Sequence, residues 1–171
     1  MSYDGQYNPK LVTCTIAGAL GALAIPIVIP GLPQGFTLPY TVTGRTTDNF
    51  FTVTNASDMV SNVVGAEGNV THVINNDESG NISIVVKRGS PSNVLLGILF
   101  RAQRLIGEGQ LPPFTFGVTV RDNNATPPTS HAAFNCLIMR QPDDTFGASE
   151  GDITWGFMAA TIVSNFQGRI Y

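Results

Sequence analysis

Near the middle of this chain, the spacing of hydrophobic residues changes from the period of a strand to that of a helix. Ile82, Ile84 and Val86 alternate with Ser83, Val85 and Lys87, which is the two-residue period of a half-buried strand. Ser90 is suited to cap a helix, and Pro91 to its first position, where the missing N–H costs nothing. We therefore predict a strand and then a helix over about 91–106, with Gly107 as its stop.

This predicted helix is apolar on two faces. One face can cover a sheet and carries Val94, Leu95, Ile98, Leu99, Ala102, Leu105 and Ile106. Leu96 and Phe100 lie four residues apart on the other side. They are either a scattered surface pair or the mark of a helix buried on both sides. We favour the second interpretation because no other clear helix is predicted. Leu96 and Phe100 are therefore candidate contacts with another subunit, shielded from solvent only in an assembly.

The other periodic segments predict strands. They cover residues 11–17, 23–29, 37–42, 50–53, 59–64, 70–74, 114–120, 132–139 and 153–163. The turn-forming residues 75–80 predict a hairpin between strands 70–74 and 82–86. Strand 132–139 is apolar on both faces, as expected of a central strand. A phase shift at Ala159 and Ala160 indicates a bulge in the last strand.

The order of these segments predicts one mainly β domain over residues 1–171. Several strands, one helix and then three strands favour a β-sandwich or flattened barrel with one flanking α-helix. Residues 1–10 form a polar arm, and 30–49 form a long loop rich in proline and glycine. Loops of this length in small domains commonly serve function or bind a partner. The loop therefore adds three candidate contacts between subunits, which are Pro33, Phe36 and Tyr40.

Composition and charge narrow the possible functions. Charged residues make up 12% of the chain and hydrophobic residues 43%, which suits a β fold that hides surface in an assembly. The net charge of −3, without a lysine and arginine cluster, argues against a nucleic-acid binder. Residues 11–32 are uncharged, but their prolines and glycines oppose a lipid-exposed helix. We expect Cys14 and Cys136 to be buried free thiols, with a disulfide as the alternative.

The residues that carry chemistry are few and scattered. The chain has no phosphate loop, dinucleotide fingerprint, nucleophile elbow or zinc-protease helix motif. His72 and His131 stand alone, so neither is expected to bind a metal. One acidic cluster is either a solvated loop, the simpler interpretation, or a divalent-cation site; it contains Asp143, Asp144, Glu150 and Asp152. We predict no enzyme activity, no metal and no cofactor.

Several short stretches from Phe51 onward carry a resemblance to a known family. They are Phe51-Thr52-Val53, Gly65-Ala66-Glu67-Gly68, Gly80-Asn81-Ile82-Ser83-Ile84-Val85-Val86, Ser90-Pro91-Ser92-Asn93, Asp152-Ile153-Thr154-Trp155-Gly156-Phe157 and the terminal aromatic. In their order and spacing the chain resembles small tail tube proteins of long-tailed bacteriophages, in particular those with contractile, sheathed tails. The Ser-Pro-Ser-Asn helix start is the most distinctive stretch. Residues 31–49 depart from the pattern, because this connection looks longer than in the family.

The resemblance implies a structural subunit of a phage tail tube. Hexameric rings would stack into a hollow tube that conducts DNA during ejection, with sheath, tape-measure and baseplate proteins as partners. It implies a place in the virion tail after assembly in the bacterial host cytoplasm, with no membrane. One alternative is a baseplate or tail-terminator subunit that forms a single ring. Another is a tube subunit of a contractile injection or secretion machine.

A DNA-conducting tube places a demand on its inner wall. DNA must slide without sticking, so we expect the lumen to carry more acidic than basic side chains and to bind no double-stranded DNA at moderate salt. Repulsion acts over about 8 Å at physiological salt, so only side chains near the passing DNA matter. The lumen candidates are Asp77, Glu78, Asp143, Asp144 and Glu150.

Overall fold

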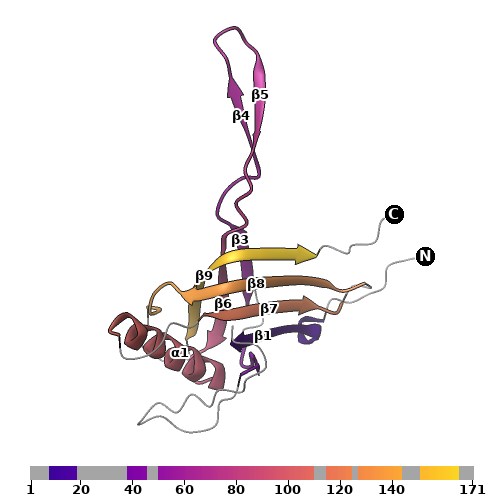
Figure 1. The fold of residues 1–171 in the computed structure, drawn as a ribbon. Helices are drawn as coiled ribbons and strands as arrows, with labels where there is room; N and C mark the ends of the chain where they lie inside the picture. The colour runs from indigo at the N-terminus through magenta and orange to yellow at the C-terminus, as the bar shows by residue number, and fades with distance from the viewer. Residues whose placement is uncertain are drawn as a thin grey trace, which may run out of the picture.

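A computed structural model of the 171-residue chain describes residues 8–18, 38–45, 50–109, 115–124, 127–143 and 151–165. Its body is a large sheet with one helix, and a long hairpin projects from it (Figure 1). In chain order the elements are the 3-10 turn Pro9–Leu11, β1 Val12–Gly18, β2 Tyr40–Thr41, β3 Phe51–Asn55, β4 Val60–Val64, β5 Val70–Ile74, β6 Gly80–Lys87, α1 Pro91–Gly107, β7 Phe116–Asp122, β8 Thr129–Ile138 and β9 Asp152–Asn165. The predicted mainly β fold with one helix is confirmed.

Seven strands form one antiparallel sheet in the order β2-β1-β7-β8-β9-β6-β3. β8 lies at its centre, as the sequence predicted. Residues 42–45, which follow β2, contact strands near both ends of this sheet. The Val42 N–H donates to the Cys14 carbonyl of β1 at 2.8 Å. Arg45 forms an isolated bridge with Val86 of β6. The sheet therefore curls around the core instead of lying open.

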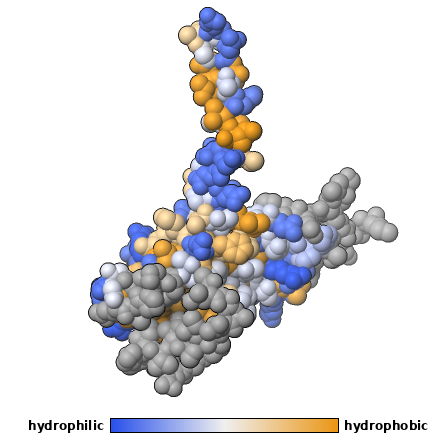
Figure 2. Space-filling model, viewed as in Figure 1, coloured by the Kyte–Doolittle hydropathy of each residue, from blue (hydrophilic) through white to orange (hydrophobic). Residues whose placement is uncertain are grey.

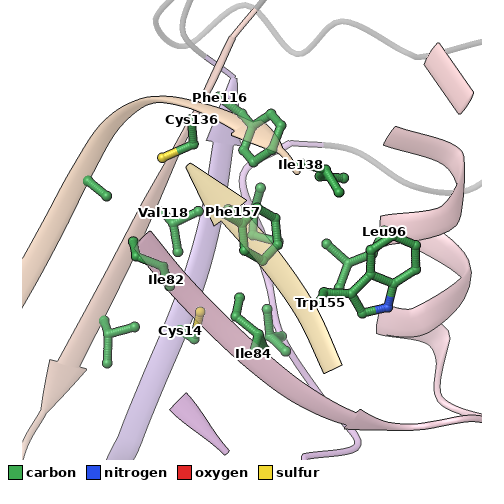
Figure 3. Packing of buried hydrophobic residues seen from close by; sticks show 14 of the residues in the cluster. Cys14, Ile82, Ile84, Leu96, Phe116, Val118, Cys136, Ile138, Trp155 and Phe157 are labelled. Carbon is green, nitrogen blue, oxygen red and sulfur yellow. The ribbon is translucent and has the colours of Figure 1, made fainter. Parts of the chain in front are cut away.

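The core fills the inner face of this curled sheet. Alternate residues of β1, β6, β7 and β9 are buried there, so each strand keeps the two-residue period seen in the sequence. Phe116 and Phe157 meet edge to face, with ring centroids 5.7 Å apart. Figure 3 shows these rings among the buried side chains of the neighbouring strands.

The helix begins where the sequence predicted. The Ser90 hydroxyl accepts a hydrogen bond from the Asn93 N–H at 3.2 Å, and Pro91 occupies the first helical position. Gly44 lies against this helix start with a φ of +67°, and a side chain there would meet Ser90 Cβ at 2.3 Å. Glycine is therefore required at position 44 both by its conformation and by the close approach.

Two side chains of the helix fix it to the sheet. The Trp155 indole of β9 donates to the Asn93 side-chain oxygen at 2.9 Å. The Gln103 amide bonds the Ile138 backbone of β8 in both directions, as donor and as acceptor, each at 2.9 Å. These bonds satisfy polar groups at the helix–sheet contact and hold the helix at the ends of the two central strands.

The burial of the helix corrects two expectations about its faces. Leu96 is 0% exposed in the single chain, so its side chain is shielded from solvent without another subunit. Figure 3 shows it pointing from α1 into the core, on the side of Trp155. Val94, expected to face the core, is 43% exposed. Segments distant in sequence lie against the start of the helix, because the Thr43 N–H bonds Ser92, and Trp155 of β9 bonds Asn93.

The hairpin predicted between 70–74 and 82–86 is wrong. β5 pairs with β4, through Val60 opposite Ile74 and Val64 opposite Val70. β6 instead lies between β3 and β9 in the main sheet. The polar segment 75–79 is thus the descending base of a projecting hairpin and not a tight turn.

The last strand shows the predicted shift in which of its residues face the core. Ala159 and Ile162 are both buried, so the inward phase moves by one residue between them. The register irregularity itself lies between β7 and β8, where Phe116 opposes Cys136 and Val118 opposes Ala133. Asn135, within this extra length of β8, has a φ of +52°. An additional residue in β8 therefore bends the centre of the sheet.

Some expectations lie outside the described residues. They concern the strand 23–29, the loop residues Pro33 and Phe36, most of the arm 1–10, and the carboxylates Asp144 and Glu150. Among the residues that are described, no helix combines the length and the apolar character needed to cross a membrane.

Candidate assembly surfaces

The projecting hairpin is the most exposed part of the described chain. Every residue of β4 and β5 is exposed, and Figure 2 shows apolar side chains along the projection. From Asn55 to Gly65 the chain reaches up to about 33 Å, at about 3.3 Å per residue. An isolated two-stranded hairpin is marginally stable in water. Its exposed apolar side chains therefore indicate a surface that becomes covered in an assembly.

The strand register divides the hairpin into two faces. We call one of them the hairpin face; it carries Val60, Val64, Val70 and Ile74. At its centre His72 Nδ1 and the Asn62 side-chain oxygen lie 2.7 Å apart in a hydrogen bond. The opposite face carries Val63 and Val73 among smaller polar side chains. The hairpin face is thus the more apolar of the two.

Polar side chains hold the base of the hairpin. The Ser57 hydroxyl donates to the Asp77 carboxylate at 2.8 Å, and the Ser79 N–H donates to it at 3.0 Å. Hydrogen bonds from Ser79 and then Ser57 keep the pKa of Asp77 below its usual value. Asp77 therefore stays charged at neutral pH. Asp77, Glu78 and Asp143 are exposed, as a lumen position requires, but their place in a bore stays a prediction.

A second apolar surface lies on the outer face of the main sheet. We call it the sheet patch; it contains Phe134, Leu137 and Met139, from β8 and the residue after it, and Met158 and Val163 from β9. Leu137 lies directly opposite Met158 in the β8–β9 register. Each of the five side chains is between 41% and 58% exposed. The central strand is therefore apolar on both faces, but only its inner face is covered by this chain.

The helix contributes a smaller hollow. It has a volume of about 340 Å³ and is lined by Phe100, Arg101, Arg104, Pro142, Ile153 and Trp155, among others. The Phe100 ring lies 6.4 Å from the Trp155 ring and is half-buried. Phe100 therefore keeps some exposed surface beside two arginines, and its contact with another subunit stays a prediction.

Tyr40 is the one loop candidate within the described residues. Its hydroxyl lies 3.3 Å from the buried Ser92 hydroxyl, which also accepts the Thr43 N–H at 2.7 Å. These bonds attach the segment after residue 38 to the helix start. Tyr40 has this structural role within the chain, and its half-buried ring leaves part of its surface for a neighbour.

The described residues contain no group of three or more histidine, cysteine or carboxylate side chains suited to hold a metal ion. Cys14 and Cys136 are both free and buried, so the disulfide alternative is not what the structure has. Burial raises the pKa of the Cys14 thiol to about 12 and that of Cys136 to about 11. Both thiols are therefore protonated at neutral pH.

This thiol state predicts slow chemical modification. Because the thiolate is the reactive form, neither cysteine should react with a thiol reagent at pH 8 within minutes in the folded protein. Both should react at once in denaturant, where the ordinary pKa returns. Counting labelled thiols by mass spectrometry at pH 8, with and without denaturant, checks this. Rapid labelling of the native protein would contradict the burial of these side chains.

The comparisons with known proteins identify the class. Residues 23–166 match the family model of the bacteriophage PhiTE tail tube protein, which covers most of the chain. The chain therefore belongs to the bacteriophage PhiTE tail tube protein family. No curated protein sequence matches it significantly.

Two solved structures of low sequence identity are similar to this chain. The tube-terminating cap of the anti-feeding prophage is 10% identical with a TM-score of 0.50, over 96% of this chain and 94% of that one. The sheath/tube terminator of the PVC extracellular contractile injection system, in its extended state, is 10% identical with a TM-score of 0.49, over 89% and 92% of the two chains. At such identities the first likeness establishes the fold alone.

Sequence reasoning missed both apolar surfaces defined above. The signal for the hairpin was present, because Val60, Val63 and Val64 do not alternate and Val70, Val73 and Ile74 repeat this pattern. A strand with apolar side chains on both faces is commonly central in a sheet. Such a strand can equally belong to a two-stranded ribbon that another molecule covers, and a single sequence does not distinguish this ribbon from a central strand.

Proposed function

We propose that this chain is the structural subunit of a phage tail tube, in which hexameric rings of identical copies stack into a hollow tube. The observation that carries the proposal is the projecting hairpin, whose two strands contain no charged residue and carry apolar side chains on both faces, in a chain of the tail tube family. Such a ribbon needs a partner, and an assembly of identical copies supplies one. A ring also requires that unlike patches meet, which an arm and a receiving surface provide.

In this proposal the tube conducts DNA and performs no chemistry. Its other partners are sheath, tape-measure and baseplate proteins, and its location is the virion tail after assembly in the host cytoplasm. The inner wall repels phosphate through acidic side chains, for which Asp77, Glu78 and Asp143 are the candidates with described positions. Six copies of a net charge of −3 make each ring strongly acidic.

A second candidate function is a ring that ends a tube. The fold shared with the tube-terminating cap of the anti-feeding prophage favours including it. A terminator has the same fold and the same ring, but its rings do not stack. A third candidate function is the tube subunit of a contractile injection or secretion machine. Such a tube differs from a phage tail tube in what it carries and not in how it assembles.

Electron microscopy of the purified full chain tests the proposal. We expect hollow tubes of stacked sixfold rings that lengthen with protein concentration. Isolated rings that never stack would favour the terminator instead. Monomers at every concentration up to the millimolar range would contradict both candidates. Assembled tubes should bind no labelled double-stranded DNA at moderate salt, and salt-dependent binding would contradict the acidic wall.

A further inference from the structure

Two surfaces hold nearly all the large apolar side chains that the described part of the chain leaves exposed. One is the hairpin, and the other is the sheet patch on β8 and β9; outside them only Leu11 and Val94 are exposed to this degree. The exposed fractions of the five patch residues and of Val60, Val64, Val70 and Ile74 all exceed two fifths. Two uncovered apolar surfaces on one chain raise the question whether they cover each other.

We propose that the hairpin face of one copy docks on the sheet patch of a neighbouring copy. This contact rests on the proposed function, in which identical copies assemble, and it names the two surfaces that meet. The occupant of the sheet patch is thus a second copy of this chain, through residues 60–74.

The two surfaces match in shape. The hairpin face is two strands wide and five residues long. The sheet patch is also two strands wide, and it extends along β8 from Ala132, which lies opposite Val163, to Met139. At about 3.3 Å per residue, the hairpin face is about 17 Å long and fits within the sheet patch, which is about 23 Å long. Flat β surfaces of this kind stack face to face at about 10 Å, with their side chains interdigitated.

The two surfaces also match in polarity. Neither β4 nor β5 contains a charged residue, β8 contains none, and β9 has only Asp152 at its first position. No charge must therefore lose its water when they meet. The polar pair in the middle of the hairpin face, Asn62 and His72, is already hydrogen-bonded to itself, which lowers the cost of covering it.

The direction of the hairpin makes the contact intermolecular. Figure 1 shows β4 and β5 projecting away from the body that holds β8 and β9, so the hairpin does not fold back on its own sheet patch. A contact between two unlike patches is heterologous, and each copy both gives and receives one. Repeated around an axis, this contact closes a ring, and along an axis it continues a stack.

Chemical cross-linking of the full chain tests this contact. The variant Val64→Cys/Met158→Cys places one thiol on each surface, and a short bis-maleimide then joins thiols that lie close together. The native Cys14 and Cys136 are buried and protonated, so they should not compete. We expect a ladder of covalent dimers, trimers and longer oligomers on a denaturing gel, because a heterologous contact links each copy to the next.

Two controls make the result specific. Each single variant, Val64→Cys or Met158→Cys, has one thiol per chain and stops at a dimer. The matched variant Val64→Cys/Arg101→Cys carries its second thiol on the exposed side of α1, on the opposite side of the sheet, and we expect no ladder from it. Thermal unfolding of all variants shows that these exposed substitutions leave the fold intact.

The outcomes separate this contact from the proposed function. Tubes or rings in the microscope without a ladder from Val64→Cys/Met158→Cys overturn the contact and leave the function standing. If the control Val64→Cys/Arg101→Cys gives a ladder and Val64→Cys/Met158→Cys does not, the hairpin contacts α1 of the neighbouring copy, which also overturns the contact. Absence of any assembly of the unsubstituted chain contradicts the proposed function, and the contact with it.

Discussion

Replacing residues 57–78 with Asn-Gly is expected to abolish assembly and to leave a folded monomer. In β3 and β6, Asn55 lies opposite Gly80, and the Ala56 N–H donates to the Ser79 carbonyl at 3.0 Å. A two-residue Asn-Gly turn therefore closes the two strands in their native register. No residue of the excised segment belongs to the buried core. The variant should lose the tubes entirely, because it loses the arm that reaches a neighbouring copy.

Stability and assembly are measured on the same variant, which lacks residues 57–78. The body loses two hydrogen bonds, one from the Ile162 N–H to the Glu78 carbonyl and one from the Ser79 N–H to the Asp77 carboxylate, so the free energy of unfolding should fall by about 1–2 kcal/mol. Circular dichroism and thermal unfolding follow the fold, and electron microscopy with analytical ultracentrifugation follows the assembly. Tubes formed by the excised protein would show that the hairpin is dispensable and would contradict the proposed role of this arm.

Phe157→Ala is expected to cost about 3–5 kcal/mol of the free energy of unfolding. The side chain is 0% exposed and packs edge to face on Phe116 at the centre of the core. The truncation removes both the buried area and the aromatic pair, and it leaves a cavity that the rigid strands on either side do not fill. A domain of this size has about 5–15 kcal/mol in total, so the variant should be largely destabilised.

Met158→Ala is the matched control, because the next residue of β9 points to the outer face. Its side chain is 58% exposed, and the change should shift the free energy of unfolding by less than about 0.5 kcal/mol. Both substitutions are best measured by urea unfolding in the excised background, where assembly does not add to stability. Equal losses in the two variants would contradict the assigned faces of β9.

The strands and the helix of the body followed from local pattern where that pattern was strong. The helix occupies Pro91–Gly107, against a prediction of about 91–106, because its cap, its first proline and its period agree. β7 and β9 were predicted in place for the same reason, since a strand with one buried face alternates strictly. The central place of β8 followed from its apolar character.

Local sequence pattern did not predict which strands pair with each other or which side chains the rest of the chain buries. The polar residues 75–79 have the composition of a tight turn, and only the pairing of β5 with β4 shows that they form the base of an arm. Leu96 lies outside the main apolar stripe of its helix, and it is buried because chain segments distant in sequence embrace the helix start. Helical position indicates which side chains share a face, but not what covers that face.

The sequence by itself determined the class of fold, the place of the helix, the lack of a catalytic motif and the resemblance to tail tube proteins, which the family match confirms. These features depend on the spacing of hydrophobic residues and on short motifs, which involve residues close together in the sequence. The tertiary structure alone decided that β6 joins β3 and β9, that Leu96 belongs to the core, and that the hairpin and sheet patch stay uncovered. Those facts depend on contacts between residues far apart in sequence, whose pairing is chosen by the packing of the whole chain.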